Sequence, residues 1–512
     1  MNGLNTNLNK SENKLSGYPD GYIRSRIGLT LGPLAVLFLL FIGAPDGLIE
    51  LTGSAEQAKN AWVVLCLLVF MAIWWVTEAV PIPVTALLPL VVLPMTAVQS
   101  IKVTSAEYMH PIIVLLMGGF IIAKAIERWD LHKRIALSVV NFVGFKPSLI
   151  VGGFMLAGAL LSMWISNSAT CIMLTPIAIS VAAAVVGDDR VNSPFTYALL
   201  LGIAYACSVG GLGTPVGTPT NLIIIGYLND SIGMDISFGQ WVAIGLPVIL
   251  CVVPLIWWSL TKLIFKVEDT DFDEEGGREI VQSELKKLGG ITIPEKRTLI
   301  VFSVVAFLWC FRNLLKDFSL FGITPFSGLT DHITAIFGVI LCFLVPSGSS
   351  KERGTAILDW KTAESIPWGP LLLFGGGMSI AAAIRTSGLA DWVGLQLGGL
   401  AGMQIVFLVL LLTAFVIFIT EVMSNVATAS TLMPILGAAA ISSGLSVELL
   451  ALPIAMAASC AFMLPTATGP NAVVFASGQV SLPTMVKAGF VANCLAIPVI
   501  TVLSLLLSPI IL

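Results

Sequence analysis

Two short polar motifs of nearly the same sequence stand inside long apolar segments of the chain. Residues Ser166–Thr170 read Ser-Asn-Ser-Ala-Thr, and residues Ser424–Thr428 read Ser-Asn-Val-Ala-Thr. In both copies a hydroxyl side chain precedes the first serine by four residues, and a proline follows that serine by ten. These flanking residues are Ser162 and Pro176 in the first copy, and Thr420 and Pro434 in the second. The matched spacing indicates a duplicated structural unit.

Further blocks match around the two motifs. Downstream, Pro215–Asn221 (Pro-Val-Gly-Thr-Pro-Thr-Asn) corresponds to Pro465–Asn471 (Pro-Thr-Ala-Thr-Gly-Pro-Asn), and upstream Met117–Gly119 echoes Phe374–Gly376. A lone Ser-Asn pair has another explanation, a serine that bonds its own helix backbone. Four blocks in the same order favour an internal repeat. Paired interruptions in two halves point to a transporter binding site made of broken helices near the membrane midplane.

The repeated motifs are rich in hydroxyls, amides, glycines and prolines, and they contain no Lys or Arg. An anion bound there would therefore depend on backbone N–H groups at half-helix N-termini, together with Ser, Thr and Asn donors. The residues expected to face the two carboxylates of a dianion are Ser166, Asn167, Ser168, Ser424, Asn425, and Thr218 or Thr468.

Interrupted helices also leave carbonyl groups free, and these suit a hard cation such as sodium. A bound cation would offset the charge of the anion, so the two should bind cooperatively in a site of low dielectric. Each repeat is expected to supply one cation site. The first would use Ser162, Asn167 and carbonyls around Gly211 to Gly213, and the second Thr420, Asn425 and the carbonyls of Met423 and Ala467.

The composition indicates a membrane protein. The chain has 512 residues, of which 56% are hydrophobic and 11% charged, whereas soluble domains carry about 25% charge. Apolar stretches of about 17–25 residues, long enough to cross a bilayer, recur along the chain. The net charge of −4 and the lack of a basic stripe give no indication of a nucleic-acid partner. The eight cysteines show no metal-binding spacing.

Hydropathy predicts an all-α chain with two halves, residues 27–265 and 298–512, joined by a charged cytosolic linker at 266–297. Residues 1–26 are expected to be a cytosolic tail. The expected single helices are Ile27–Ala44, Ala61–Val80, Val84–Met95, Pro111–Ile126, Phe195–Val209, Trp241–Phe265, Leu299–Cys310, His332–Val345, Pro367–Ile384, Leu449–Met463 and Met485–Leu512. Lys and Arg gather at alternate helix ends, which places those ends and the N-terminus in the cytoplasm.

Two apolar segments are too long for one helix, namely Pro147–Val186 and Met403–Gly437. Each has its Ser-Asn motif in the middle. A polar pair at that place predicts a helical hairpin that enters the membrane and turns back, with its tip buried in protein. These two hairpins, near residues 147–186 and 403–437, are the central structural expectation.

Other polar residues have plainer interpretations. Lys124 and Glu127, at helical spacing, are expected to pair, and Glu78 is expected to pair at the membrane interface. Glu421 is expected either to tune a cation site or to pair with a neighbouring helix. The histidines, at positions 110, 132 and 332, are isolated in sequence. The acidic run Asp269–Glu275 is typical of a solvated linker.

These motifs resemble the divalent anion:sodium symporters, a family that includes sodium/dicarboxylate and citrate cotransporters. The resemblance covers about residues 27–512. It implies about eleven transmembrane helices plus two re-entrant hairpins in an inverted repeat, a scaffold domain that forms a homodimer, and a transport domain that moves as an elevator. It also implies that the motifs Ser166-Asn167-Ser168 and Ser424-Asn425-Val426 bind both substrate and sodium ions.

Four residues, two in each half, depart from the family pattern. The third motif residue is usually threonine. Ser168 retains the hydroxyl group of that threonine, whereas Val426 lacks it. Thr220 and Gly469 stand where the pattern often has proline. The resemblance implies sodium-coupled symport of C4-dicarboxylates such as succinate, malate or fumarate, and the short loops indicate a bacterial inner membrane. A sodium-independent exchanger, or a carrier of citrate or sulfate, stays open as an alternative.

Two other classes of function find little support. An intramembrane enzyme would need GxSxG, HExxH or a paired-aspartate site, and none is present within the expected spans. A passive channel is built from rings of charge or carbonyls across subunits, whereas a repeat within one chain suits alternating access. The sequence therefore predicts a carrier rather than an enzyme or a pore.

Overall fold

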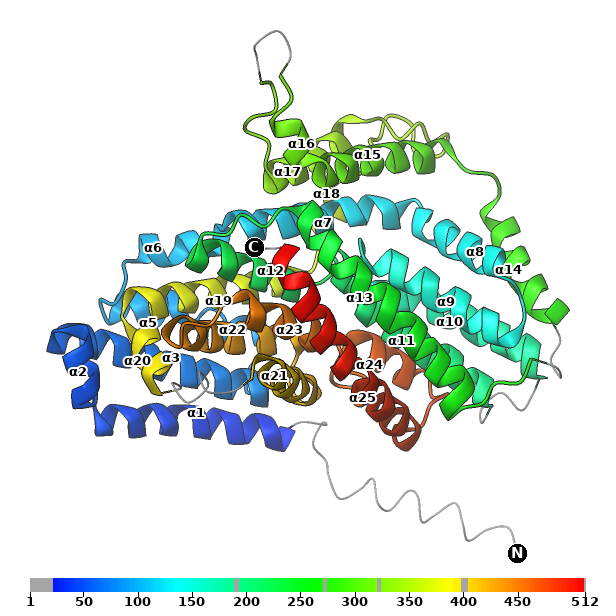
Figure 1. The fold of residues 1–512 in the computed structure, drawn as a ribbon. Coiled ribbons are helices and arrows are strands. Elements are labelled where there is room, and N and C mark those ends of the chain that lie inside the picture. The colour runs from blue at the N-terminus through cyan, green and yellow to red at the C-terminus, as the bar shows by residue number, and fades with distance from the viewer. Residues whose placement is uncertain (1–21, 188–192, 270–273, 320–323, 397–403, 511–512) are drawn as a thin grey trace, which may run out of the picture.

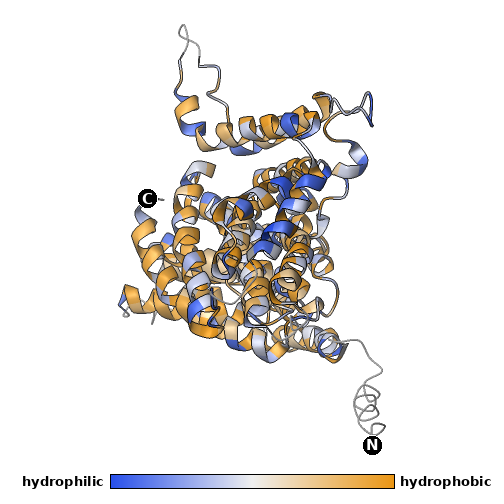
Figure 2. Ribbon diagram, turned by 90° about the vertical axis from the view of Figure 1, so that its right-hand side faces the viewer, coloured by the Kyte–Doolittle hydropathy of each residue, from blue (hydrophilic) through white to orange (hydrophobic). Residues whose placement is uncertain are grey.

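The computed structural model describes residues 22–187, 193–269, 274–319, 324–396 and 404–510. These residues form helices and loops, with one isolated β-bridge between Pro346 and Ala356 and no strand in the described ranges. Seven of the described helices are long and apolar enough to cross a membrane. The expected all-α multi-pass membrane architecture is confirmed, and apolar residues dominate the helices in Figure 2.

Outside the hairpins and crossovers described below, the helices (Figure 1) are α1 (Tyr22–Ile42), α2 (Asp46–Thr52), α3 (Ala55–Thr77), α4 (Ile82–Thr85), α5 (Leu88–Met95), α6 (Ile101–Ala106), α7 (Pro111–Arg128), α8 (Leu131–Val143), α13 (Phe238–Trp258), α14 (Glu274–Leu288), α15 (Ile293–Cys310), α16 (Arg312–Lys316), α17 (Asp331–Leu344), α18 (Trp360–Ala363), α19 (Trp368–Thr386), α20 (Leu389–Gln396) and α25 (Leu482–Leu507). Of these, helices α1, α3, α7, α13, α15, α17, α19 and α25 lie close to expected ranges, whereas α2, α6, α8, α16, α18 and α20 were not expected.

Two expectations need correction. The single helix expected at Val84–Met95 is two short helices, α4 and α5, because Pro89 has no N–H for a continuous helix. The expected linker contains helix α14, whose apolar positions recur at helical spacing and bury Val281. This helix packs on α8 and α10 rather than lying free.

Each long apolar segment folds as two helices joined by a four-residue turn. In the first, α9 (Pro147–Ser162) and α10 (Asn167–Val186) flank residues 163–166; in the second, α21 (Ile405–Thr420) and α22 (Asn425–Ser442) flank residues 421–424. Both α9 and α21 have 16 residues, which gives a length of about 24 Å. A bilayer core is roughly 30 Å thick, so neither helix is long enough to cross it.

The two downstream blocks also break their helices. In the first half, α11 (Pro194–Gly210) ends in a 3₁₀ turn at Gly211–Gly213, and α12 (Pro219–Tyr227) follows. In the second half, α23 (Glu448–Ala458) and α24 (Gly469–Ala476) are separated by an extended loop. Each half therefore contains one hairpin and one broken helix, here called the crossover, as the repeat predicts.

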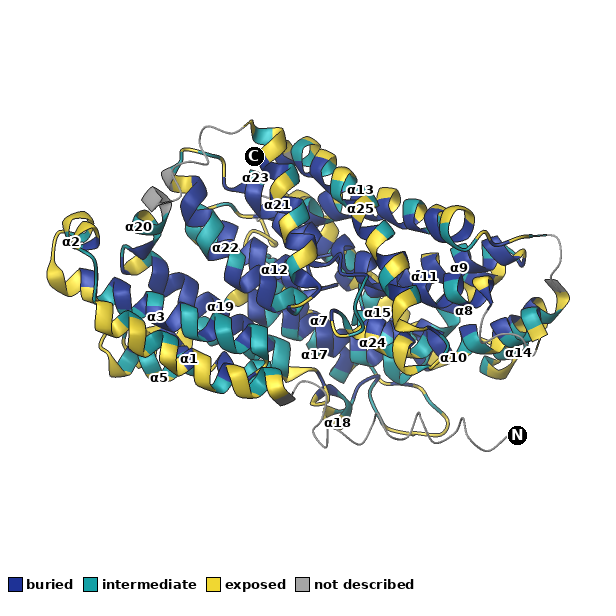
Figure 3. Ribbon diagram, turned by 90° about the horizontal axis from the view of Figure 1, so that it is seen from below, coloured by how far each residue is buried: buried dark blue, intermediate teal, exposed yellow. Residues whose placement is uncertain are grey.

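The helices divide into an inner set and a frame. The inner set is α9–α13 and α21–α25, and the frame is α1, α3–α7, α15, α17 and α19. In the segment Pro194–Gly213 of the inner set, 94% of the membrane-length window is buried, compared with 11% for Ile23–Ile42 in the frame. The segment Pro194–Gly213 is thus shielded by protein, whereas α1 presents apolar side chains outward, as lipid contact requires (Figure 3).

Candidate functional site

The first hairpin turn lies against the first crossover. Ser166 is the N-cap of α10 and Asn167 its first residue. A Cβ atom placed on Gly211 would come within 2.8 Å of Asn167 Oδ1, so the glycine is what allows the amide to approach the 3₁₀ turn. Thr214 Oγ1 donates a hydrogen bond to the carbonyl of Met163 in the hairpin turn. Asn167 and Gly211, predicted as one site, are brought together.

Several oxygen atoms converge here, and among them the carbonyls of Met163 and Gly211 accept from Thr214 Oγ1 and Asn221 Nδ2. Ser162 Oγ is fully buried and has only a weak hydrogen bond with the Cys207 thiol, whereas the buried Asn167 Oδ1 makes no hydrogen bond within the described residues. A Cβ on Gly217 would lie 3.0 Å from the carbonyl oxygens of Ser162 and Met163, and 2.5 Å from that of Gly211. A buried, uncharged set of oxygen atoms is the ligand chemistry of a hard cation. The residues present fit a sodium site.

The second hairpin has a matching oxygen cluster. Thr420 Oγ1 lies 3.1 Å from Asn425 Oδ1 and 3.1 Å from the carbonyl oxygen of Ala458. The single hydroxyl proton satisfies one of these acceptors at a time, so an oxygen atom remains available for a cation. Ser424 caps α22 by accepting from the N–H of Ala427. Thr420 and Asn425 are thus adjacent, as predicted.

The remaining predicted cation ligands are placed less directly. Gly213 packs against the side chains of Met163 and Ile249. Met423 and Ala467 are buried beside the second turn and second crossover, respectively. The contacts described for these residues do not join them to the Thr420 cluster, so their roles as cation ligands stay predictions.

The site prediction did not include Asn221 and Asn471, whose side-chain amides hold the backbone of the two crossovers. Asn221 Nδ2 donates to the carbonyls of Gly211 (2.9 Å) and Thr214 (2.8 Å), and Asn471 Nδ2 donates to those of Ala461 (3.0 Å) and Leu464 (3.0 Å). Each amide thus ties its crossover helix to carbonyls ten and seven residues earlier. The available signal was the asparagine that ends both repeated downstream blocks.

The two halves meet at the first motif. A Cβ on Gly469 would stand 1.9 Å from Ser168 Oγ, so this hydroxyl points at the second crossover. Cys171 Sγ donates to the carbonyl of Pro470 at 3.5 Å. Helix α10 packs on α24, and α12 packs on α22. Each hairpin therefore contacts the crossover of the other half, and Ser168 is placed at one of these contacts.

A second hydroxyl contact joins the crossovers themselves. Thr220 Oγ1 lies 2.9 Å from Thr218 Oγ1 and 3.1 Å from Ser459 Oγ. Thr218 and Thr468 are the N-caps of α12 and α24, and Thr468 Oγ1 accepts from the N–H of Asn471. Both threonines predicted to face carboxylates thus stand at half-helix N-termini, where backbone N–H groups favour an anion.

Glu421 is fixed within the second crossover. Its carboxylate accepts hydrogen bonds from the N–H groups of Phe462, Met463 and Leu464 and from Asn493 Nδ2 of α25 at 2.7 Å. The first of the two expectations, tuning of the adjacent cation site, is untested, and the second is confirmed by Asn493. The corresponding first-half residue is Met163, so the two turns differ in charge.

The other charged residues form the expected pairs, with one correction. Lys124 Nζ lies 2.6 Å from Glu127 Oε2, and Arg24 lies 3.3 Å from Glu78. The expectation that His110 is isolated is wrong, because its Nε2 lies 3.3 Å from Asp230 Oδ2. Sequence separation hid this contact, which joins the N-terminus of α7 to the segment after α12.

A cavity of about 610 Å³ reaches the first motif from one end of the bundle. We call it the vestibule. It is lined by Ile165 and Ala169, which flank the motif, and by charged residues from α7, α8 and α14. The charged lining residues are Glu127, Asp130, Lys133 and Glu284. The vestibule thus lies beside the first hairpin turn, and its α10 wall is formed by the apolar residues Ile172, Met173, Pro176 and Ile177.

Helices that break at corresponding places in two halves of one chain are the construction of secondary transporters. The fold and the paired turns are therefore those of a multi-pass membrane transporter. Residues 29–511 match the family described as the sodium:sulfate symporter transmembrane region. The chain belongs to this divalent anion:sodium symporter family, as the motifs led us to expect.

Curated relatives cover nearly the whole chain. The sodium-dependent dicarboxylate transporter SdcS of Staphylococcus saprophyticus is 39% identical over 507 residues, which is 98% of this chain and 94% of the relative. SdcS of Staphylococcus aureus strain USA300 is 38% identical over 493 residues, 95% of this chain and 92% of the relative.

Two solved structures share the fold at low sequence identity. The YdaH transporter of Alcanivorax borkumensis has a TM-score of 0.55 and 16% identity, over 88% of this chain and 97% of that one. MtrF of Neisseria gonorrhoeae, described as an antimetabolite efflux pump, has a TM-score of 0.55 and 13% identity, over 80% and 84%. They support the architecture alone.

Proposed function

We propose that this protein is a sodium-coupled symporter of C4-dicarboxylates such as succinate, malate and fumarate. The relatives named sodium-dependent dicarboxylate transporters match almost the full chain. The observation that carries the proposal is the cluster of buried oxygen atoms at the first hairpin turn, where Asn167 Oδ1 makes no hydrogen bond and Ser162 Oγ has only the weak Cys207 thiol as a partner. Burying such an oxygen atom destabilises the fold unless a cation or a hydrogen-bond donor interacts with it.

In this proposal each half binds one sodium ion and contributes half of the anion site. The first ion is held by Ser162, Ser166, Asn167 and carbonyls at Gly211 and Gly213, and the second by Thr420, Asn425 and carbonyls at Met423 and Ala467. The carboxylates are bound by Ser166, Asn167, Ser168, Thr218, Ser424, Asn425 and Thr468, with Val426 as an apolar wall.

The coupling follows from charge. The two motifs contain no positively charged side chain. The cost of desolvating a dianion therefore opposes its binding at the turns unless cations are already bound. Two sodium ions would neutralise it. Substrate and sodium then bind together and cross together, which is symport.

We further propose that the inner set moves as the transport domain of an elevator and that the frame is a dimeric scaffold. The hairpin turns bury Met163 and Ile165 in the first half and Glu421 and Met423 in the second, as expected of re-entrant hairpins whose tips pack in protein. The ends of the bundle that carry Arg128, Arg134 and Lys287 would face the cytoplasm of a bacterial inner membrane by the positive-inside tendency, and so would the N-terminus.

The test is uptake of labelled succinate into proteoliposomes that contain the purified protein. An inward sodium gradient should drive accumulation, and replacement of sodium by choline should abolish it. Equal uptake in choline with only internal dicarboxylate would instead establish sodium-independent exchange. Competition by citrate or sulfate, but not by malate or fumarate, would reassign the substrate class.

A further inference from the structure

The segment Leu228–Phe238, here called the connector, links the inner helices α12 and α13. It begins with a π-helical turn at Leu228–Ile232 and ends where Ser237 caps α13. Its polar groups are bound by the ends of four elements outside the inner set: α7, α16, α17 and α19. The connector is therefore a place where polar contacts tie the inner set to its surroundings.

Two ties come from α7 and α19. Asp230 Oδ2 lies 3.3 Å from Nε2 of His110, the N-cap of α7, and both side chains are largely shielded. Arg385, near the end of α19, donates from Nη1 to Ser231 Oγ at 2.9 Å. Neighbouring connector residues are thus held by two different frame helices.

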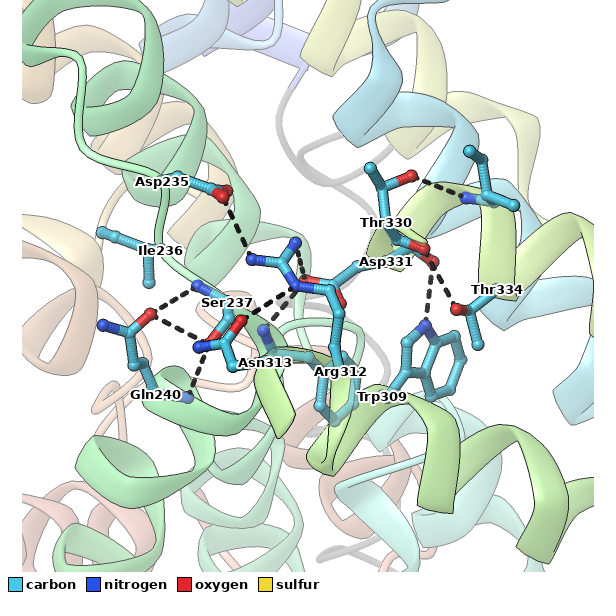
Figure 4. Close-up of polar contacts among 12 residues, drawn as sticks. Asp235, Ile236, Ser237, Gln240, Trp309, Arg312, Asn313, Thr330, Asp331 and Thr334 are labelled. Atoms are coloured by element: carbon cyan, nitrogen blue, oxygen red, sulfur yellow. Dashed lines mark hydrogen bonds and ion pairs between the residues drawn. The ribbon is translucent and has the colours of Figure 1, made fainter. Parts of the chain in front are cut away.

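Two further ties meet at Arg312, which is the first residue of α16 and whose side chain is only 5% exposed. Its guanidinium lies between Asp235 of the connector and Asp331 of α17, with N–O distances of 3.2 Å to each (Figure 4). Asp331 Oδ2 also accepts from the N–H of Phe238 at 2.9 Å. Ring stacking of Phe238 on Trp309 of α15 adds an apolar contact at 4.7 Å.

These ties lie at the end of the bundle opposite to the vestibule. The vestibule end is marked by Arg134 bonded to Glu295 and by Arg128 bonded to Glu352. Helices α7, α15 and α19 run from one end to the other, and their opposite ends carry the contacts to the connector. The described conformation is thus open beside the first motif at one end and tied at the other.

We propose that the connector is a latch, whose ties to His110, Arg385, Arg312 and Asp331 hold the conformation with the vestibule open. The proposal rests on the proposed function, because only alternating access requires the ties to break in every cycle. A two-state protein shifts by the difference in contact free energy between its states. Contacts made in one state alone set how much time the transporter spends there.

The first experiment weakens the latch and measures access to the vestibule. Ile172, which lines the vestibule and is 57% exposed, is replaced by cysteine in a background with the exposed Cys251, Cys310 and Cys494 changed to serine. Its reaction with a membrane-impermeant maleimide from the vestibule side is then timed. The double variant Asp230→Asn, Asp235→Asn should react about threefold more slowly.

A milder variant controls for misfolding of the double variant. Ser231→Ala removes one hydrogen bond, from Arg385, and should slow the labelling in the same direction by a smaller factor. Unchanged or faster labelling in both folded variants overturns the latch. This readout needs no substrate, so it does not depend on whether dicarboxylate uptake is found.

The second experiment closes the latch permanently. His110→Cys and Asp230→Cys, joined by a short bis-thiosulfonate reagent, should arrest uptake reversibly while Ile172→Cys stays reactive. The matched control joins Ser347→Cys to Thr355→Cys, whose parent hydroxyls lie 3.0 Å apart within one loop, and this bridge should leave uptake intact. Normal uptake by the bridged His110–Asp230 protein overturns the latch, whereas absent uptake before bridging counts against the proposed function alone.

Discussion

Ser168 Oγ occupies the space that a side chain at Gly469 would need, since a Cβ there would stand only 1.9 Å from it. The first residue belongs to the hairpin of one half and the second to the crossover of the other. The pair explains two departures from the family pattern together: the smaller third motif residue and the glycine in place of proline. The two halves share a boundary that a single added carbon atom would disturb.

Substitution Gly469→Ala should therefore raise the KM for dicarboxylate about tenfold. The new methyl group turns the Ser168 hydroxyl away from the site, and a hydrogen bond to a charged group contributes about 1.5–3 kcal/mol. Because a serine rotamer is free to change, the folded yield should stay normal. Uptake kinetics measure this, with Gly47→Ala as the control, since a Cβ at Gly47 meets no atom within 4 Å. An unchanged KM would remove Ser168 from the site.

Removal of either motif amide should abolish uptake. Asn167→Ala deletes the oxygen beside Gly211, and Asn425→Ala deletes the oxygen beside Thr420. Both side chains line polar turns rather than a packed core, so size-exclusion profiles should match the parent protein. Asn141→Ala, on the exposed side of α8, is the matched control and should transport normally. Parental uptake by both motif variants would refute the site.

The crossover amides should matter for stability, and equally in the two halves. Asn221→Ala and Asn471→Ala each remove two buried hydrogen bonds of 2.8–3.0 Å and leave two carbonyls unsatisfied. Each lost partner costs about 1–3 kcal/mol, so each variant should unfold at a clearly lower denaturant concentration. A large effect in one half with none in the other would contradict the structural equivalence of the repeats.

The motif positions could be predicted from the sequence because the two halves carry the same small polar residues at the same spacing. Ser166, Asn167, Ser424 and Asn425 all stand at helix N-termini, as expected. The helix in the linker was missed because the dense charge of Glu274–Leu288 obscured its apolar stripe. The contact of His110 with Asp230 depends on tertiary packing across 120 residues, which no local pattern records.

The linker contributes a pH-sensitive contact through Asp269. Its carboxylate accepts from the N–H and hydroxyl of Ser148 in the first turn of α9, both at 2.9 Å, and pairs with Lys262. Burial raises the pKa of Asp269, but these hydrogen bonds and the lysine outweigh it and lower the pKa below its ordinary value.

The lowered pKa of Asp269 means that it stabilises the fold above its unfolded pKa of about 3.9 and loses this effect as pH falls through the folded pKa. Asp269→Asn should therefore lower the stability by about 1 kcal/mol at pH 7, in line with the loss of a helix cap. The difference from the parent should shrink below about pH 4. Thermal unfolding at pH 7 and pH 3 measures it, and an equal difference at both values would exclude the cap.

The central claim is that uncharged turns bind a dianion only together with cations. Equilibrium binding of labelled succinate to purified protein, titrated with sodium at constant ionic strength with choline, tests it directly. We expect no saturable binding in choline and an affinity that rises steeply with sodium concentration. Binding of equal affinity with and without sodium would contradict the account.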